Sequence, residues 1–322
     1  MTAQLTAGAL LAQATRRLAT ALRTPAPATE APPGATSSTV AGTPPGIAAP
    51  STAAPPGAPP SAAASASIDA QLLLAHALGV TRTRALTHLE RVPDPLEAQR
   101  YGSLIERRAR GEPLAYILGT KEFWSLPLTV GPEVLVPRPE TELLVERALA
   151  LRAEPAGRVA DLGTGSGAIA LALALERPQW QVVATDISAD ALVTAKANAV
   201  ALDLGRIEYL QGHWFTPLRG RSFNLIVSNP PYVAENDPAM QDPALRHEPR
   251  IALTPGVDAY QCLREIIRGA PEHLERDGWL LLEHGADQAS EVARELVGRG
   301  FRSVRSHRDL AGHERVTEAQ RM

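Results

Sequence analysis

Cysteine is nearly absent from the sequence: Cys262 is the only one among 322 residues, so no disulfide can form within the chain. In an apolar helical pattern this residue is most simply a small core side chain. The eight histidines show no HxxxH spacing, and no CxxC pair occurs. A zinc site therefore has little support.

Neither an excess of one charge nor a long apolar run is present. The formal net charge is −3, which gives no electrostatic footprint for tight binding of duplex nucleic acid, although a local basic patch could still exist. No run approaches the ~18 consecutive apolar residues of a membrane span. We therefore expect no membrane span, and direct binding of nucleic acid is disfavoured. We also expect the protein to be a cytoplasmic monomer.

The first 23 residues contain leucines at helical spacing and three arginines but no acidic residue. This composition fits an amphipathic organelle-targeting segment as well as an ordinary first helix. We favour the helix, because the apolar spacing continues to the end of the segment without a cleavage-like stretch. A secretory signal is disfavoured, since no basic region precedes a compact apolar block.

Residues 25–67 consist almost entirely of Pro, Ala, Gly, Ser and Thr, and they hold 11 of the 28 prolines. Such a segment buries too little apolar surface to offset the entropy of ordering it, so we predict a disordered tether. A Pro-rich partner ligand is the alternative, which the irregular arrangement of the prolines disfavours. We expect order to resume at Ile68, with helices near 69–78 and 95–110.

The chain is expected to hold three parts. Residues 1–112 would form a small helical domain interrupted by the tether, and residues 113–137 a β-hairpin linker. From 138 to 322 strand-like and helix-like segments alternate, which predicts an α/β fold with a doubly wound, mostly parallel sheet covered on both faces. The last two predicted strands, 301–307 and 314–319, are joined by a short loop and would form an antiparallel hairpin at one edge.

A short polar motif, Ser228-Asn229-Pro230-Pro231-Tyr232, follows the apolar run 223–227. It therefore lies just past the carboxyl end of a predicted buried strand, where open α/β sheets place their chemistry. The two prolines fix the backbone and lack N–H groups, so the loop is stiff and its carbonyls are unpaired acceptors. A plain strand-terminating turn is the alternative interpretation.

The side chains of this motif suit a planar –NH2 group. Asn229 can add an acceptor through its side-chain oxygen, and Tyr232 can place a flat ring against the substrate. The nitrogen of such a group is a poor nucleophile because its lone pair is delocalised. Holding both N–H bonds in acceptors would aim that lone pair at an electrophile, without a general base acting beforehand.

A glycine-rich turn, residues 161–167 with the sequence DLGTGSG, lies between the first predicted strand of the sheet and its helix. Glycines let the backbone approach a ligand, and the helix N-terminus offers N–H groups. The spacing differs from the G-x-G-x-x-G of nicotinamide dehydrogenases, which are therefore disfavoured. Asp186, 19 residues after Gly167, is expected to bind ribose hydroxyls rather than cap the next helix. Trp214 could flank an adenine ring or be core.

Acidic residues and prolines also gather in the segment 137–142, with the sequence PRPETE. They are placed as at the start of a helix. Helix capping explains Glu140 and Glu142 without any function, whereas a role in lining an active site is equally compatible with the sequence. Both interpretations stay open.

The glycine turn, the ribose acid and Asn-Pro-Pro-Tyr together resemble class I S-adenosylmethionine-dependent methyltransferases that act on planar nitrogen. Further motifs are similar to those of the peptide chain release factor glutamine-N5 methyltransferase family, over residues 68–322. These motifs are GEPLAY at 111–116, EFW at 122–124, PRPETE at 137–142, EHG at 283–285 and ERVT at 314–317. One departure is the tether, which is longer than the short loop of that family.

The resemblance implies methyl transfer from S-adenosyl-L-methionine to the glutamine of the Gly-Gly-Gln loop of release factors, which tunes translation termination, with S-adenosyl-L-homocysteine as the other product. The helical N-terminal domain would dock the release factor. The residues implied for the cofactor are Gly163, Thr164, Gly165, Ser166 and Gly167 around its methionine part, Asp186 on the ribose, Trp214 on the adenine side and Asn229. The residues implied for the glutamine are Asn229, Pro230, Pro231 and Tyr232.

Two other functions compete with this one. A nucleic-acid adenine-N6 or guanine-N2 methyltransferase would use the same tetrapeptide, but an enzyme acting on duplex DNA needs base flipping and a basic recognition domain. A non-catalytic docking protein that kept the fold would be expected to lose the glycine turn or the Asn, and both are present.

Overall fold

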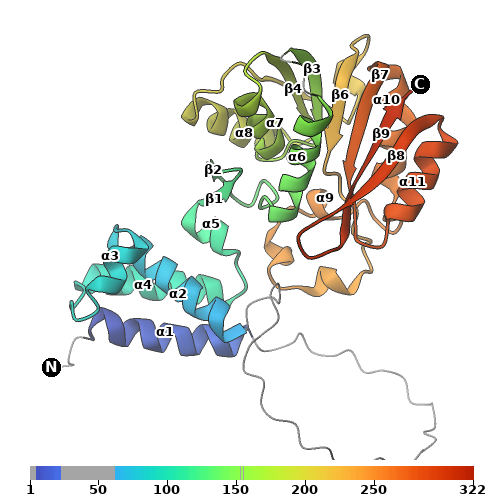
Figure 1. Ribbon diagram of the computed structural model, residues 1–322. Helices are drawn as coiled ribbons and strands as arrows, with labels where there is room; N and C mark the ends of the chain where they lie inside the picture. Colours follow the sequence, from blue (N-terminus) through green and yellow to red (C-terminus); the bar gives the residue numbers. More distant parts are fainter. Residues whose placement is uncertain (1–4, 23–61, 153, 155) are drawn as a thin grey trace, which may run out of the picture. The chain divides into compact units, whose positions relative to one another are not determined.

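The computed structural model describes residues 5–22, 62–152, 154 and 156–322. Within it the chain forms two compact units, Met1–Pro95 and Leu96–Met322. Figure 1 shows the elements of each unit. Residues 25–61 of the predicted tether lie outside the described part, and the predicted domain limits at 112 and 137 stay predictions.

The first unit is helical, as predicted. Its helices are α1 (Ala7–Ala21), α2 (Ala62–Leu78) and α3 (Arg82–Thr87). The hydroxyls of Thr6 and Thr81 accept the N–H of Ala9 and of Arg84 and so cap α1 and α3. Helix α2 begins before Ile68, so the predicted end of the tether at Ser67 is wrong. The prolines stop at Pro60, and the alanine-rich residues that follow favour a helix.

The second unit begins with α4 (Pro95–Ala109), the short α5 (Leu114–Leu118) and a hairpin of β1 (Thr120–Phe123) and β2 (Leu126–Thr129). The antiparallel pairing of the two strands confirms the predicted hairpin. Trp124 and Ser125 have φ of 52° and 59°, which is the backbone of a tight turn that matches strand twist. Helix α5 was not predicted.

A seven-stranded sheet forms the centre of the second unit, in the order β5-β4-β3-β6-β7-β9-β8. Strands β3 to β7 run parallel, while β9 is antiparallel to both β7 and β8. The predicted mostly parallel sheet with an antiparallel pair at one edge is therefore confirmed. The strands are β3 (Gly157–Leu162), β4 (Trp180–Asp186), β5 (Glu208–Gln211), β6 (Phe223–Ser228), β7 (Leu274–Glu283), β8 (Phe301–Arg308) and β9 (Glu314–Arg321).

Helices cover both faces of this sheet (Figure 1). Side chains alternate along each strand, so β6 sends Leu225 and Val227 into one core and Ile226 into the other. The first core is closed by α6, α7 and α8, and the second by α10 and α11. These helices are α6 (Glu142–Leu151), α7 (Ala168–Glu176), α8 (Ala189–Ala201), α10 (Gln261–His273) and α11 (Ala289–Gly298).

Short helical turns occupy the connections: η1 (Pro139–Thr141), η2 (Thr216–Leu218), η3 (Pro238–Gln241), η4 (Leu245–His247) and α9 (Arg250–Leu253). Within the described residues, no helix is both long and apolar enough to cross a membrane.

The order of the strands fixes where a ligand can bind. From β3 the chain winds outward through β4 to β5, then crosses back to add β6 on the other side of β3. Crevices at the carboxyl ends of strands form at such a switch in winding direction. The glycine-rich turn follows β3 and the Asn-Pro-Pro-Tyr segment follows β6, so the two predicted motifs flank the same crevice.

Candidate active site

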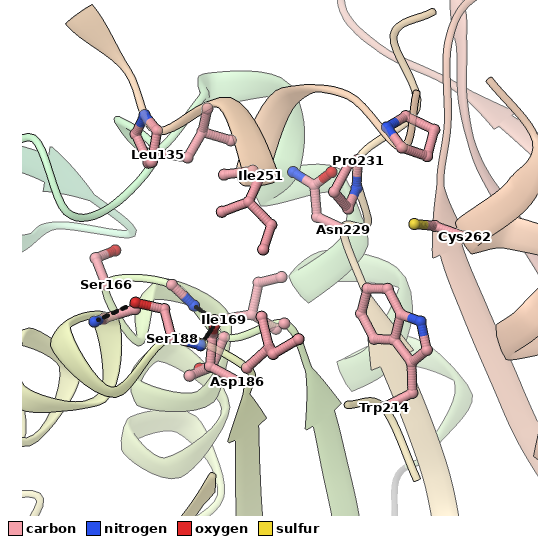
Figure 2. A pocket seen from close by; sticks show the side chains of 18 of the residues that line it. Leu135, Ser166, Ile169, Asp186, Ser188, Trp214, Asn229, Pro231, Ile251 and Cys262 are labelled. Atoms are coloured by element: carbon pink, nitrogen blue, oxygen red, sulfur yellow. Dashed lines mark hydrogen bonds between the residues drawn. The ribbon is translucent and has the colours of Figure 1, made fainter. Parts of the chain in front are cut away.

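A cavity of about 310 Å³ opens at this crevice, large enough for a small ligand. Figure 2 shows residues from several loops around it. The residues proposed from the sequence that line it are Gly163, Thr164, Gly165, Ser166, Asp186, Trp214, Asn229 and Pro231. Gly167, Pro230 and Tyr232 are not among the lining residues.

The glycine-rich turn is held in shape by the protein itself. The N–H groups of Gly163 and Thr164 both donate to the carbonyl of Thr185, at 2.9 Å each. Gly163 has φ of 73°, and a Cβ atom at this residue would lie 3.2 Å from the Trp214 ring. A side chain would thus strain the backbone and press on the cavity wall, which explains the glycine.

Two carboxylates tie the turn to the ends of β3 and β4. Asp161 is fully buried and accepts the Thr164 hydroxyl at 2.6 Å, and burial raises the pKa of its carboxyl to about 7. Asp186 accepts the N–H of Gly165 and that of Ser188, both at 2.9 Å. Burial raises the pKa of Asp186 as well. The Asp186 side chain also lines the cavity, and a carboxylate has acceptor sites beyond the two used by these N–H groups.

Asp186 does not cap the helix that follows it. The N-cap of α8 is Ser188, whose hydroxyl accepts the N–H of Ala191. The helix-capping alternative for Asp186 is therefore wrong, and its carboxylate belongs to the cavity wall.

Trp214 forms another part of the wall and is fixed by its own ring nitrogen. Its Nε1 donates to Glu265 Oε2 at 3.0 Å, and the His213 ring contacts the same carboxylate oxygen at 3.4 Å. The residue has φ of 43°, an unusual backbone for a bulky side chain, and this turns the indole beside Gly163. Trp214 thus lines the cavity and also packs on the second core.

Asn229 is oriented by a residue that the sequence did not point to. Its Nδ2 donates to the Thr141 hydroxyl at 3.1 Å, and both residues line the cavity. Because the amide nitrogen of Asn229 is engaged, the amide oxygen remains as the acceptor for a ligand. Prolines fix the backbone on both sides of this pair: Pro139 begins the turn with Thr141, and Pro230 follows Asn229.

Tyr232 points away from the cavity wall toward a buried acid. Its hydroxyl donates to Glu283 Oε1 at 3.2 Å, and burial raises the pKa of the Tyr232 hydroxyl. Glu283 is 1% exposed. Burial raises the pKa of Glu283 to about 7, whereas the hydrogen bond from Tyr232 and the charge of Arg315 act to lower it.

The two acids flanking Thr141 differ in their environment. Glu142 accepts the backbone N–H of Trp124 at 2.8 Å and so secures the β1–β2 hairpin. Glu140 is exposed and is not among the residues lining the cavity. Thr141, which lies between them, is the residue that reaches Asn229. Only the run of prolines and acids around it could have pointed to this segment.

The segment after the Asn-Pro-Pro-Tyr motif returns to the cavity. Glu248 is buried and accepts Arg138 Nη2 at 2.5 Å and the backbone N–H of Val136 at 3.0 Å. Arg138 and Ile251 both line the cavity. Sequence reasoning missed this ion pair, because no local pattern connects residues 110 positions apart.

Cys262 was expected in the core, but it is only half-buried and lines the cavity near the start of α10. The apolar pattern around Cys262 describes helix α10 as a whole. The first turn of this helix lies at the cavity, so Cys262 reaches the cavity. Burial raises the pKa of the thiol to about 11, so it is not a reactive thiolate near neutral pH.

The lining fits an adenosyl ligand by its chemistry. Asp186 offers acceptors for paired hydroxyls, Trp214 offers a flat apolar face, and the turn around Gly165 leaves open space beside its backbone. Among the described residues, no group of three or more His, Cys, Asp or Glu could hold a metal ion.

Comparisons with known proteins agree with this site. Residues 61–119 match the model described as PrmC N-terminal domain, and residues 139–246 match the one described as methyltransferase small domain. Release factor glutamine methyltransferase of Pseudomonas aeruginosa is 50% identical over 80% of this chain and 93% of its own length. The chain belongs to the release factor glutamine methyltransferase family. The protein of the same name from Neisseria gonorrhoeae is 49% identical over 78% of this chain and 92% of its own.

A solved structure agrees in fold with this family member. The catalytic domain of hMettl16, solved in complex with the MAT2A 3′UTR hairpin 6, superposes with a TM-score of 0.52 over 70% of this chain and 81% of that one, at 18% identity. This similarity supports the class I methyltransferase fold. It does not identify the substrate, because a fold does not determine function.

Replacing Thr141 with valine tests its role in this methyltransferase. The Asn229 amide would lose its acceptor and gain freedom to rotate, so we expect methyl transfer to fall about 5- to 30-fold, as for the loss of one hydrogen bond. Affinity for S-adenosyl-L-methionine, measured by calorimetry, should stay nearly constant. Unchanged turnover would contradict the orienting role, and Thr141→Ser, which keeps the hydroxyl, is the matched control.

Replacing Asp161 with asparagine should change how stability depends on pH. The carboxyl binds its proton up to about pH 7 in the folded chain but only to about pH 4 when unfolded. Between these two pH values the folded state therefore binds more protons than the unfolded state. Because of this carboxyl, the free energy of unfolding falls as pH rises through this range. Thermal unfolding from pH 4 to 8 should show a smaller decline for Asp161→Asn than for the wild type. If the stabilities of the two proteins changed with pH in parallel, the raised pKa of Asp161 would be refuted.

Proposed function

We propose that this methyltransferase takes the methyl group from S-adenosyl-L-methionine and places it on N5, the side-chain amide nitrogen of the glutamine in the Gly-Gly-Gln loop of peptide chain release factors. Membership of the release factor glutamine methyltransferase family supports the substrate class. The observation that carries the chemistry is the hydrogen bond from Asn229 to Thr141, which leaves the Asn229 oxygen as a fixed acceptor at the cavity.

The cofactor would be held by the turn 163–167, by Asp186 and by Trp214. The Asp186 lone pairs left over from Gly165 and Ser188 would accept the ribose hydroxyls, and the indole of Trp214 would lie along the adenine. When bound, S-adenosyl-L-methionine supplies an electrophilic methyl group. The glycine turn is set in shape by internal hydrogen bonds, so little ordering entropy is lost on binding.

Asn229 and Pro230 would hold the substrate amide. The Asn229 side-chain oxygen accepts one N–H and the Pro230 carbonyl accepts the other, which orients the nitrogen lone pair and stabilises charge developing on that nitrogen. The nitrogen becomes acidic only as its bond to the methyl carbon forms, so no group of the protein needs to deprotonate it first, and the proton is lost to solvent afterwards. Pro231 would close the pocket, whereas the Tyr232 ring, which does not line the cavity, would hold the segment from behind through Glu283.

The remaining parts of the proposal concern partners. Residues 1–112 would dock the release factor, and the protein would work as a monomer in the cytoplasm, where translation terminates. Direct contact with nucleic acid is not required. The nucleobase alternative is not favoured, because the relatives with high coverage carry the name of a protein substrate.

A labelling experiment tests this function. The protein is incubated with methyl-labelled S-adenosyl-L-methionine and either a bacterial release factor or its Gln→Ala variant in the Gly-Gly-Gln loop. We expect label only in the unaltered release factor, mapped by mass spectrometry to the glutamine side chain. Label in the Gln→Ala variant, or in added RNA or DNA instead, would overturn the proposal.

A further inference from the structure

The turn Glu283-His284-Gly285 lies beside the Asn-Pro-Pro-Tyr segment without lining the cavity. Strands β6 and β7 are parallel neighbours in which Ser228 pairs with Leu282. The next residue along the chain is Asn229, just past the end of β6, in one case and Glu283, the last residue of β7, in the other. The turn is therefore placed next to the reactive segment by the register of the sheet.

Tyr232 is held from two directions by this part of the chain. Its hydroxyl donates to Glu283 Oε1 at 3.2 Å. Its backbone carbonyl accepts Gln288 Nε2 at 3.0 Å, while Gln288 Oε1 accepts the N–H of Gly285 at 2.8 Å. Because both ends of the Gln288 amide are engaged, the orientation of this side chain is fixed, and so is the carbonyl that it holds.

His284 anchors the turn to β9, the neighbour of β7 on the side away from β6. This side chain is fully buried, and its Nε2 lies 2.8 Å from the Thr317 hydroxyl on β9. Its backbone N–H donates to the carbonyl of Arg315 at 2.9 Å. Glu283 and Gln288 thus project from a rigid base.

Burying the Glu283 carboxyl is unfavourable for the stability of the fold. No ion pair is formed by this carboxyl within the described part of the chain: its Oε1 accepts the Tyr232 hydroxyl, and its Oε2 is buried without a hydrogen-bond partner. A buried acid of this kind is less favourable for stability than an apolar side chain of similar size. Its hydrogen bond with Tyr232, however, reaches the end of the segment that begins with Asn229.

We propose that Glu283 and Gln288 are positioning residues that bracket the segment 229–232, Glu283 through the Tyr232 hydroxyl and Gln288 through the Tyr232 carbonyl. They touch neither cofactor nor substrate. Their role is to keep the acceptors of Asn229 and Pro230 at fixed positions. This inference rests on the proposed function for its kinetic consequence but not for its structural one.

Three variants distinguish a role in positioning the segment 229–232 from a contribution to folding stability alone. Glu283→Gln keeps an acceptor for the Tyr232 hydroxyl, and Glu283→Leu removes it. Gln288→Met removes the hydrogen bond to the Tyr232 carbonyl with little change of side-chain volume. Gln320→Met, on the outer strand pair, is the control. Each is compared with the wild type by hydrogen exchange of residues 228–235, by thermal unfolding, and by kcat and KM with a release factor.

We expect exchange of residues 228–235 to be about 10-fold faster in Glu283→Leu and Gln288→Met, with the rest of the chain unchanged. Turnover should fall about 10- to 100-fold, while KM for S-adenosyl-L-methionine stays constant. Glu283→Gln and Gln320→Met should remain within about 3-fold of wild type, because their hydrogen-bond acceptors near Tyr232 are preserved.

Wild-type exchange in both Glu283→Leu and Gln288→Met would overturn the inference. An equal loss in Glu283→Gln, or a matching loss of cofactor affinity and melting temperature, would also overturn it, since a merely structural role predicts those results. If exchange accelerates in Glu283→Leu and Gln288→Met as expected but the wild type does not methylate release factors, the positioning role is supported and the proposed function is wrong.

Discussion

Replacing Asn229 with alanine is expected to slow methyl transfer to a release factor by about 100- to 1000-fold, the loss typical for removing one fixed group that stabilises a transition state. The substrate nitrogen would lose one of its two acceptors, and its lone pair would no longer be aimed. Affinity for S-adenosyl-L-methionine should change far less than the rate. Single-turnover kinetics and calorimetry measure the two quantities separately.

Asn224 provides a matched control for this experiment. It lies on the same strand, β6, but its side chain bonds the Arg158 backbone and Glu275 at the opposite end of the sheet. Asn224→Ala should cost some stability and leave the rate of the folded enzyme near the wild-type value. Equal rates for Asn229→Ala and the wild type would remove Asn229 from the mechanism.

Replacing Asp186 with alanine is expected to weaken binding of S-adenosyl-L-methionine about 100-fold, since two charge-assisted hydrogen bonds to ribose would be lost. The Gly165 and Ser188 N–H groups would also lose their acceptor, which loosens the turn. Turnover at saturating cofactor should fall much less, because Asp186 does not contact the substrate amide in this account.

The control for this second experiment is Asp190→Ala, four residues further on. Asp190 is exposed in the first turn of α8 and should leave affinity unchanged. If Asp186→Ala bound the cofactor as tightly as the wild type, the assignment of the ribose site would be wrong.

Local patterns in the sequence predicted most of the central sheet. Buried parallel strands are short apolar runs, so the run 223–227 placed β6 to within one residue, and the glycines marked the turn between β3 and α7. These features depend on residues close together in the chain. The site was found for the same reason, because its two motifs each follow a strand end.

Contacts between distant segments were not predictable in this way. Thr141 reaches Asn229 across 88 positions and Glu248 reaches Arg138 across 110, and neither pair has a sequence signal of its own. Glu283 was noticed only as part of a family-like motif, with no role assigned. Its bond to Tyr232 depends on the register of β6 against β7, which a single sequence does not fix.

The central claim is that two fixed acceptors hold a neutral carboxamide beside the cofactor turn. It is tested most directly by a crystal structure of the enzyme with S-adenosyl-L-homocysteine and a release factor fragment bearing the Gly-Gly-Gln loop. The account predicts the glutamine amide nitrogen at about 2.7–3.2 Å from both the Asn229 side-chain oxygen and the Pro230 carbonyl. A glutamine amide bound elsewhere, or a cavity without the adenosyl group, would contradict it.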